Sequence, residues 1–119
     1  MYTDTRSTKP ASPVVAQGIK PGDPATVFFA GRWSRAMVVT KVTPKTVVLA
    51  RVETGPEEPD MACDVGVYGS RPMVAHGILD KIIPGTEERY TWSADRKRFV
   101  HGSSRASFGS SVQWIDHRI

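Results

Sequence analysis

Valine dominates the aliphatic residues of this chain, and that bias limits the folds open to it. The sequence has 14 Val and only 2 Leu, Leu49 and Leu79. Because Val is branched at Cβ, it favours strands over helices. The 9 Pro and 10 Gly are spread along the chain and leave few stretches long enough for an ordinary helix. We therefore expect a mainly β protein.

Length and composition fit one soluble domain. The chain has 119 residues, of which 39% are hydrophobic and 24% charged, and this is the composition of a globular protein. No apolar run approaches the roughly 18–20 residues that cross a bilayer, and residues 1–15 lack the apolar core of a secretory signal. The lone Cys63 has no partner for an internal disulfide. We expect a cytoplasmic protein with no membrane contact.

Short β-rich runs separated by turn signals predict the architecture. Residues 25–30, 33–42 and 46–52 are three such runs with two- or three-residue connections, the pattern of a β-meander. Residues 89–94 and 98–101 predict a hairpin, and residues 111–116 a last strand. Five or six strands bury a core economically as a small barrel. The predicted fold is an all-β, SH3-like barrel over residues 21–119, and we assign Phe29, Tyr90, Trp92 and Phe99 to its core.

Four segments have a less regular pattern. Residues 1–20 predict a disordered or extended arm, and the acidic residues 53–60 predict a loop. Residues 71–85 fit either one short helix, near 72–83, or an irregular crossover, and Gly77 weakens the helix. Residues 102–111 are rich in Gly and Ser and predict a polar loop.

Two stretches resemble known small proteins. Gly22-Asp23, a strand, and then 31–36 (GRWSRA) resemble Tudor, KOW and other SH3-like barrels. The C-terminal stretch, 89–104 (RYTWSADRKRFVHGSS) followed by an aromatic residue before Asp116, resembles small uncharacterised phage and bacterial proteins. The resemblance implies an SH3-like fold and a phage or prophage setting, with the host cytoplasm or the virion as location. It implies no activity and no site residue.

Charge is unevenly distributed along the chain. The net charge is +4, and basic stretches at 21–52 and 89–119 flank an acidic stretch at 53–70. Basic turns attract polyanions, although a modest positive charge also serves solubility alone. We predict a binding site made of the basic turn residues and one exposed aromatic: Arg32, Trp33, Arg35, Lys45, Arg96, Lys97, Arg98 and Arg105. The acidic loop 53–60 is predicted to fold over this basic face as a competitor.

Catalytic and metal-binding patterns are missing from the sequence. One Cys and three scattered His do not have the spacing of a zinc site. The pairs Glu57-Glu58 and Glu87-Glu88 lie beside turn residues, where carboxylates are solvated. We expect no enzyme activity, no metal and no cofactor. Residues 102–105 (GSSR) fit either a flexible loop or a small nest of donors for a phosphate group.

These observations leave three functions open. The first is a non-enzymatic binding module, of phage or prophage origin, whose partner is nucleic acid or, second, an acidic host protein. The alternative is a virion structural or connector subunit that forms a homo-oligomer through its N-terminal arm. The third is a protein that sequesters nucleotide signals.

Overall fold

The computed structural model describes residues 12–29, 33–59 and 73–115. The segments 1–11, 30–32, 60–72 and 116–119 lie outside this description. The elements, in chain order, are α1 (Pro13–Gln17), β1 (Pro24–Phe29), β2 (Trp33–Val42), β3 (Thr46–Thr54), β4 (Glu58–Pro59), β5 (Met73–Ile82), β6 (Glu88–Ser93), β7 (Arg98–His101), β8 (Ser104–Phe108) and β9 (Val112–Ile115). The prediction of an all-β protein is confirmed.

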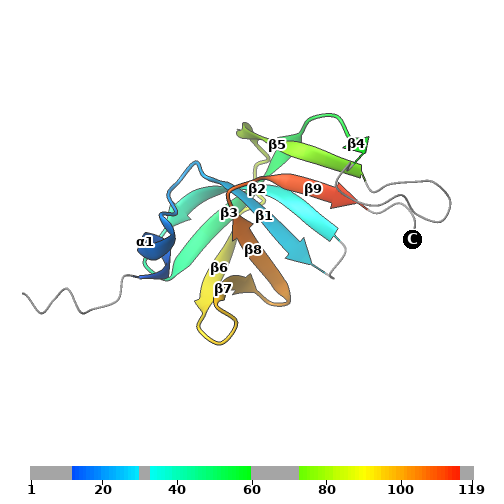
Figure 1. Cartoon of the computed structure of the whole chain (residues 1–119). Helices are drawn as coiled ribbons and strands as arrows, with labels where there is room; N and C mark the ends of the chain where they lie inside the picture. The colour runs from blue at the N-terminus through cyan, green and yellow to red at the C-terminus, as the bar shows by residue number, and fades with distance from the viewer. Residues whose placement is uncertain (1–11, 30–32, 60–72, 116–119) are drawn as a thin grey trace, which may run out of the picture.

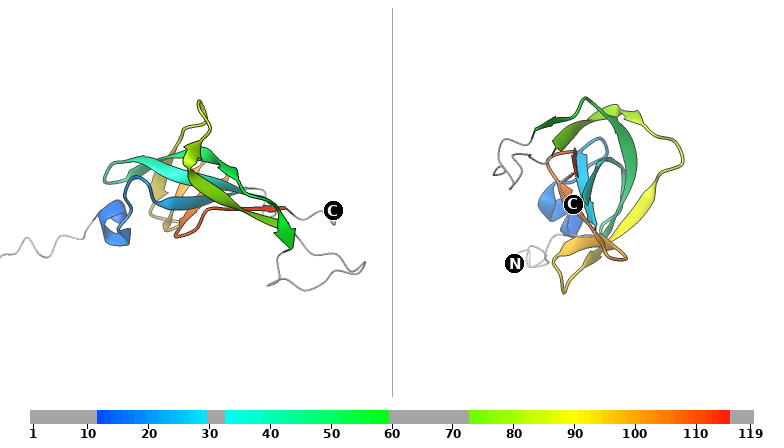
Figure 2. Two further views of the ribbon diagram at one scale, coloured as in Figure 1. Left: turned by 90° about the horizontal axis from the view of Figure 1, so that it is seen from above. Right: turned by 90° about the vertical axis from the view of Figure 1, so that its right-hand side faces the viewer.

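Six of the strands close into a ring, and Figure 1 shows how they are arranged. Strand order is β2-β1-β8-β7-β6-β3, and a further pairing between β2 and β3 completes the circle. Every neighbouring pair is antiparallel, and the right-hand view of Figure 2 shows the strands around a common interior. The meander of β1, β2 and β3 and the β6–β7 hairpin are confirmed, as is the small SH3-like barrel.

Alternating side chains fill the barrel interior. On β2, Met37 and Val39 point inward and are no more than 1% exposed, as the two-residue period of a strand requires. Aromatic and aliphatic residues from the other strands complete the core, among them Val27, Val47, Leu49, Tyr90, Phe99 and Ala106. Each fully buried side chain of this size contributes roughly 1.5–3 kcal/mol. Tyr90 and Phe99 are core residues as predicted.

A second, smaller layer covers the outer face of β2. Ala36 and Val38 point away from the barrel interior, yet both are buried, because they pack against Val52 and Leu79. Strand β5 pairs with β3 through its second half and with β9 through its first half. The run of apolar residues in β2 is therefore buried on both faces, as in strands at the centre of a two-sided core.

Strand β9 is fastened to the barrel by hydroxyl groups. Thr26 Oγ1 donates to the Ser110 carbonyl (2.9 Å) and accepts from Val112 N (3.1 Å). Ser34 Oγ donates to the Val112 carbonyl (3.1 Å) and accepts from Trp114 N (2.7 Å). These bonds satisfy the β9 backbone groups on the edge that has no strand neighbour.

The predicted helix or crossover within 71–85 is wrong, because residues 73–82 form a ten-residue strand. Gly77 has a packing role here. A Cβ on Gly77 would lie 2.3 Å from Ser111 Oγ, 2.8 Å from Val52 Cγ2 and 3.0 Å from Ala36 Cβ, so only glycine fits where β5 crosses the barrel. The apolar residues of β5 have a spacing that resembles a helix because its first half pairs with β9 and its second half with β3.

Two more expectations need correction. Residues 104–108 form strand β8 instead of a polar loop: Ala106 faces Val27 of β1, and the intervening Arg105 and Ser107 point outward. The acidic segment is not wholly a loop either, since β3 extends to Thr54 and β4 pairs with β5. In both segments partner strands override a composition typical of loops.

The predicted arm is ordered from residue 12 onward. Ser12 caps α1 by accepting a hydrogen bond from Val15 N (3.2 Å), and Gly18 ends the helix at φ 66°. Val14 (5% exposed) and Ile19 (7%) join the barrel core. The expected extended arm over 1–20 is therefore wrong for residues 12–20, and residues 1–11 lie outside the described part.

Candidate functional site

In the antiparallel ring, the turns that carry basic residues lie at two opposite ends of the barrel. The β2–β3 turn carries Lys45, and the β6–β7 turn carries Arg96 and Lys97. Thr46 is paired with Thr91, and Trp92 N donates to the Lys45 carbonyl (2.9 Å), so these turns lie side by side at one end of the barrel. We call Lys45, Arg96, Lys97 and Arg98 the basic end.

The four cations of the basic end are exposed and have no acidic partner within the described part of the chain. The only side-chain bond among them is local, from Arg98 Nε to the Arg96 carbonyl (3.3 Å). Of the nearby acids, Asp23 is paired with Lys20 (3.4 Å), and Asp95, in the β6–β7 turn itself, forms no ion pair with a described residue. The positive charge of this end is therefore available to an anion from solution.

Lys97 has an unusual backbone. Its φ of 54° is the only positive value at a non-glycine position among the described residues. The left-handed region costs a side chain of this kind roughly 1 kcal/mol and is usually filled by Gly, Asn or Asp. At this position the turn presents a cation although glycine would suit the backbone better.

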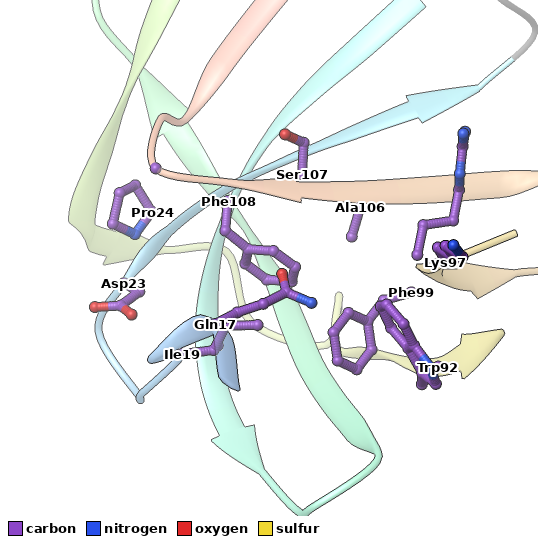
Figure 3. A pocket seen from close by; sticks show the side chains of 12 residues that line it. Gln17, Ile19, Asp23, Pro24, Trp92, Lys97, Phe99, Ala106, Ser107 and Phe108 are labelled. Atoms are coloured by element: carbon purple, nitrogen blue, oxygen red, sulfur yellow. The ribbon is translucent and has the colours of Figure 1, made fainter. Parts of the chain in front are cut away.

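A pocket of about 660 Å³ lies beside these cations (Figure 3). Trp92, Phe99 and Phe108 form its aromatic wall, with edge-to-face ring centroids 5.2 Å apart for Trp92–Phe99 and 5.7 Å apart for Phe99–Phe108. Lys97 and Trp92 lie on one side of the pocket and Asp23 on the other. The pocket thus combines flat apolar surface with cationic groups at its rim.

The remaining predicted site residues do not join the basic end. Arg35 near the start of β2 and Arg105 on β8 line a different pocket of about 570 Å³ at the opposite end of the barrel, which we call the arginine mouth. Arg32 lies outside the described residues. Trp33 begins β2 opposite Phe29, and its side chain is outside the description. The eight predicted residues therefore do not form a single surface.

The arginine mouth holds a cluster of ionisable groups. The Tyr90 hydroxyl donates to Glu88 Oε1 (3.4 Å), and His101 Nε2 lies 3.8 Å from Glu88 Oε2. Burial and, second, the nearby Glu88 carboxylate raise the pKa of Tyr90 to about 12, while Arg35 acts in the opposite direction. His101 Nδ1 donates to the Arg89 carbonyl (3.0 Å), which turns Nε2 toward the carboxylate.

A third hollow, of about 730 Å³, follows strand β9. Phe28, Val74, Val112 and Trp114 give it an apolar lining. Its two ionisable side chains face each other, with His76 Nε2 3.8 Å from Glu58 Oε1. This groove therefore suits an apolar ligand better than an anion.

The acidic segment does not cover the basic end. Lys45 directly precedes β3, whereas residues 53–59 follow from its far end, and a nine-residue strand spans about 30 Å. The prediction that the acidic loop folds over the basic residues is therefore wrong for residues 53–59 with respect to the basic end, since this segment lies at the far end of β3, where β4 is paired with β5.

The described segments contain no cluster of metal-binding side chains. No three His, Cys, Asp or Glu side chains gather there to hold a metal ion, and Cys63 lies in the segment 60–72, outside the description. None of the helices there has the length and apolar character to cross a membrane.

Comparison with protein-family models, curated proteins and solved structures finds no match for this chain.

Sequence reasoning missed the aromatic pocket at the basic end. It assigned Trp92 to the core and favoured Trp33 as the exposed aromatic. Trp92 is only partly buried and packs at the edge of the core. The signal was its position, two residues before the basic turn and on the inward face of its strand, where the barrel opens.

Proposed function

We propose that this protein is a non-enzymatic binding module that holds single-stranded nucleic acid at its basic end. One observation carries the proposal: Lys97 and Arg98 line a pocket with aromatic walls, and two further cations, Lys45 and Arg96, lie on the adjoining turns at the same end of the barrel. Proteins that bind single strands combine cationic groups for the backbone with aromatic rings on which bases stack.

The size of the site favours a single strand. A pocket of about 660 Å³ can receive an unstacked base, whereas a base inside a duplex is not free to enter. Trp92 and Phe108 supply the apolar wall, and Lys97 and Arg98 stand at the rim where a phosphate would follow the base.

Assembly through the N-terminal arm is a weaker candidate for residues 12–20. Val14 and Ile19 are buried in the chain's own core, and Val14 N donates to the Pro44 carbonyl (3.4 Å). These residues are therefore engaged within the molecule.

Fluorescence anisotropy with a labelled oligothymidylate that lacks a terminal phosphate tests the proposal. If all four cations contact phosphates, the slope of log affinity against log salt is about −3. The variant Lys45→Ser/Arg96→Ser/Lys97→Gly/Arg98→Ser should lose most binding at low salt. Arg51→Ser/Arg89→Ser, which removes two exposed cations elsewhere, is the control for net charge.

Three results would contradict the proposal: no binding by the wild type, equal loss per removed charge in the two variants, or tighter binding of an acidic peptide than of the oligonucleotide at the same end. Trp92→Ala, with the folded state checked by circular dichroism, tests the stacking component. It should weaken binding about tenfold or more if a base lies on the ring.

A further inference from the structure

Arg35 occupies an inward-facing position at the arginine mouth. It precedes the core residue Met37 by two positions on β2, so both side chains lie on the same face of the strand. Its guanidinium carbon is 4.7 Å from the centroid of the Phe29 ring. A half-buried arginine held over an aromatic face has a defined orientation and has lost part of its hydration.

The acid in this pocket does not neutralise Arg35. Glu88 also lines the mouth, but its Oε1 accepts from the Tyr90 hydroxyl and its Oε2 faces His101 Nε2. No carboxylate of the described residues lies within 4 Å of the Arg35 guanidinium. The guanidinium therefore keeps donors that an anion from solution can accept from.

Further donors surround the same space. Ser103 and Ser104, from the β7–β8 turn and the start of β8, line the mouth, and their hydroxyls make no hydrogen bond within the described part of the chain. Arg105 also borders the mouth, but its guanidinium carbon lies 5.1 Å from the centroid of Phe28, a ring on the outer face of β1, so it adds positive charge at the edge and not a donor inside the pocket. A planar guanidinium fork with hydroxyl donors beside it matches the oxygens of a phosphate group.

We propose that the arginine mouth is a binding site for a phosphate monoester, with Arg35 as the principal anchor and Ser103 and Ser104 as supporting donors. The volume of about 570 Å³ admits a phosphate with a small organic substituent. The site lies at the opposite end of the barrel from the basic end, so it does not depend on the proposed nucleic-acid binding.

Isothermal titration with inorganic phosphate, adenosine 5′-monophosphate and adenosine tests the site. The monophosphate should bind at least about tenfold more tightly than adenosine, because charge-assisted bonds to the phosphate supply the affinity. Equal affinity for inorganic phosphate would identify the free anion as sufficient, and tighter binding of the monophosphate would identify the ester. Adenosine that binds as tightly as its monophosphate would overturn the proposal.

Variants then assign the site to its residues. Arg35→Gln should weaken phosphate binding at least about tenfold, and Arg35→Lys should retain part of it, since a lysine keeps the charge without the fork. Arg89→Gln, an exposed cation on the outer face of β6, is the matched control and should change affinity less than about twofold. Unchanged affinity in a folded Arg35→Gln protein would overturn the assignment.

If Arg35→Gln fails to fold, Ser103→Ala/Ser104→Ala is the second test. These side chains are not in the core, so the variant should fold. It should bind phosphate about three- to tenfold more weakly. Wild-type affinity in this double variant, together with amide shifts confined to residues 94–98 on adding phosphate, would contradict a site at the arginine mouth.

Discussion

The two ends of the barrel differ in the number and the setting of their cations, with four at the basic end and two, Arg35 and Arg105, at the arginine mouth. At the basic end the cations lie on turns, exposed and without acidic partners, next to an aromatic pocket. At the arginine mouth Arg35 is on a strand, among Glu88, Tyr90 and His101. The difference follows from strand parity: in a closed antiparallel ring, every second turn reaches the same end. Basic residues on successive turns of the sequence therefore lie at opposite ends of the barrel.

The largest predicted effect concerns the aromatic cluster of Trp92, Phe99 and Phe108 next to the basic end. Phe99 is 1% exposed and contacts both Trp92 and Phe108, so Phe99→Ala should lower the free energy of unfolding by about 3–5 kcal/mol. Urea denaturation measures this loss.

Phe28→Ala is the matched control for Phe99→Ala. Phe28 lies on the outer face of β1 and is only partly buried, so its loss should cost less than half as much. Equal losses would show that the two rings have the same role, contrary to the packing.

The second prediction concerns the arginine mouth at high pH. The pKa of Tyr90 is raised from 10.0 to about 12 in the folded protein, so the unfolded chain releases this proton first as pH rises. Stability should be complete below pH 10 and should fall by roughly 2–3 kcal/mol between about pH 10 and pH 12.

Tyr90→Phe should remove this part of the pH dependence, as measured by urea denaturation at several pH values. The variant also loses the hydrogen bond to Glu88, which is long at 3.4 Å, so its stability near neutral pH should change by only about 1 kcal/mol. A pH profile identical to that of the wild type would show that Tyr90 does not titrate as described.

The sequence pattern was sufficient for five of the six barrel strands and for β9, but not for β8 or for β5. Alternation and turn signals identify β1, β2, β3, β6, β7 and β9, because each is a local pattern. Strands β5 and β8 escaped prediction. In the sequence, Gly77 indicates a break in β5, but in the structure glycine is needed there because Ser111 and Ala36 pack closely against it. The Ser-rich segment β8 forms a strand because it pairs with β1 and β7 on its two sides.

The candidate site was predictable in its residue types but not in its grouping. Lys45 and Lys97 are visible as turn cations, but only the pairing of β3 with β6 brings their turns together. The network of Glu88, Tyr90 and His101 joins positions 88 to 101 through the β6–β7 hairpin, and no short motif marks it.

The smallest predicted effect separates charge from backbone strain at the basic end. Lys97→Gly removes a cation and also relieves the positive φ of 54°, so stability should be unchanged or should rise by up to about 1 kcal/mol. Oligonucleotide affinity at low salt should nevertheless fall about three- to fivefold.

Arg96→Gly is the control in the same turn, since Arg96 has no positive φ. It should lower both affinity and stability, the latter by about 0.5 kcal/mol. If Lys97→Gly is the more destabilising of the two in thermal unfolding, the left-handed conformation at Lys97 is not the source of strain.

The most direct test of two chemically distinct ends is a pair of nitrogen-15 NMR titrations on the same protein. Oligothymidylate without terminal phosphates should shift the amides of Lys45 and residues 92–98. Inorganic phosphate should shift those of Arg35 and residues 103–105. If both ligands move the same set of amides, the barrel has one anion-binding surface, and the account of two separate ends is wrong.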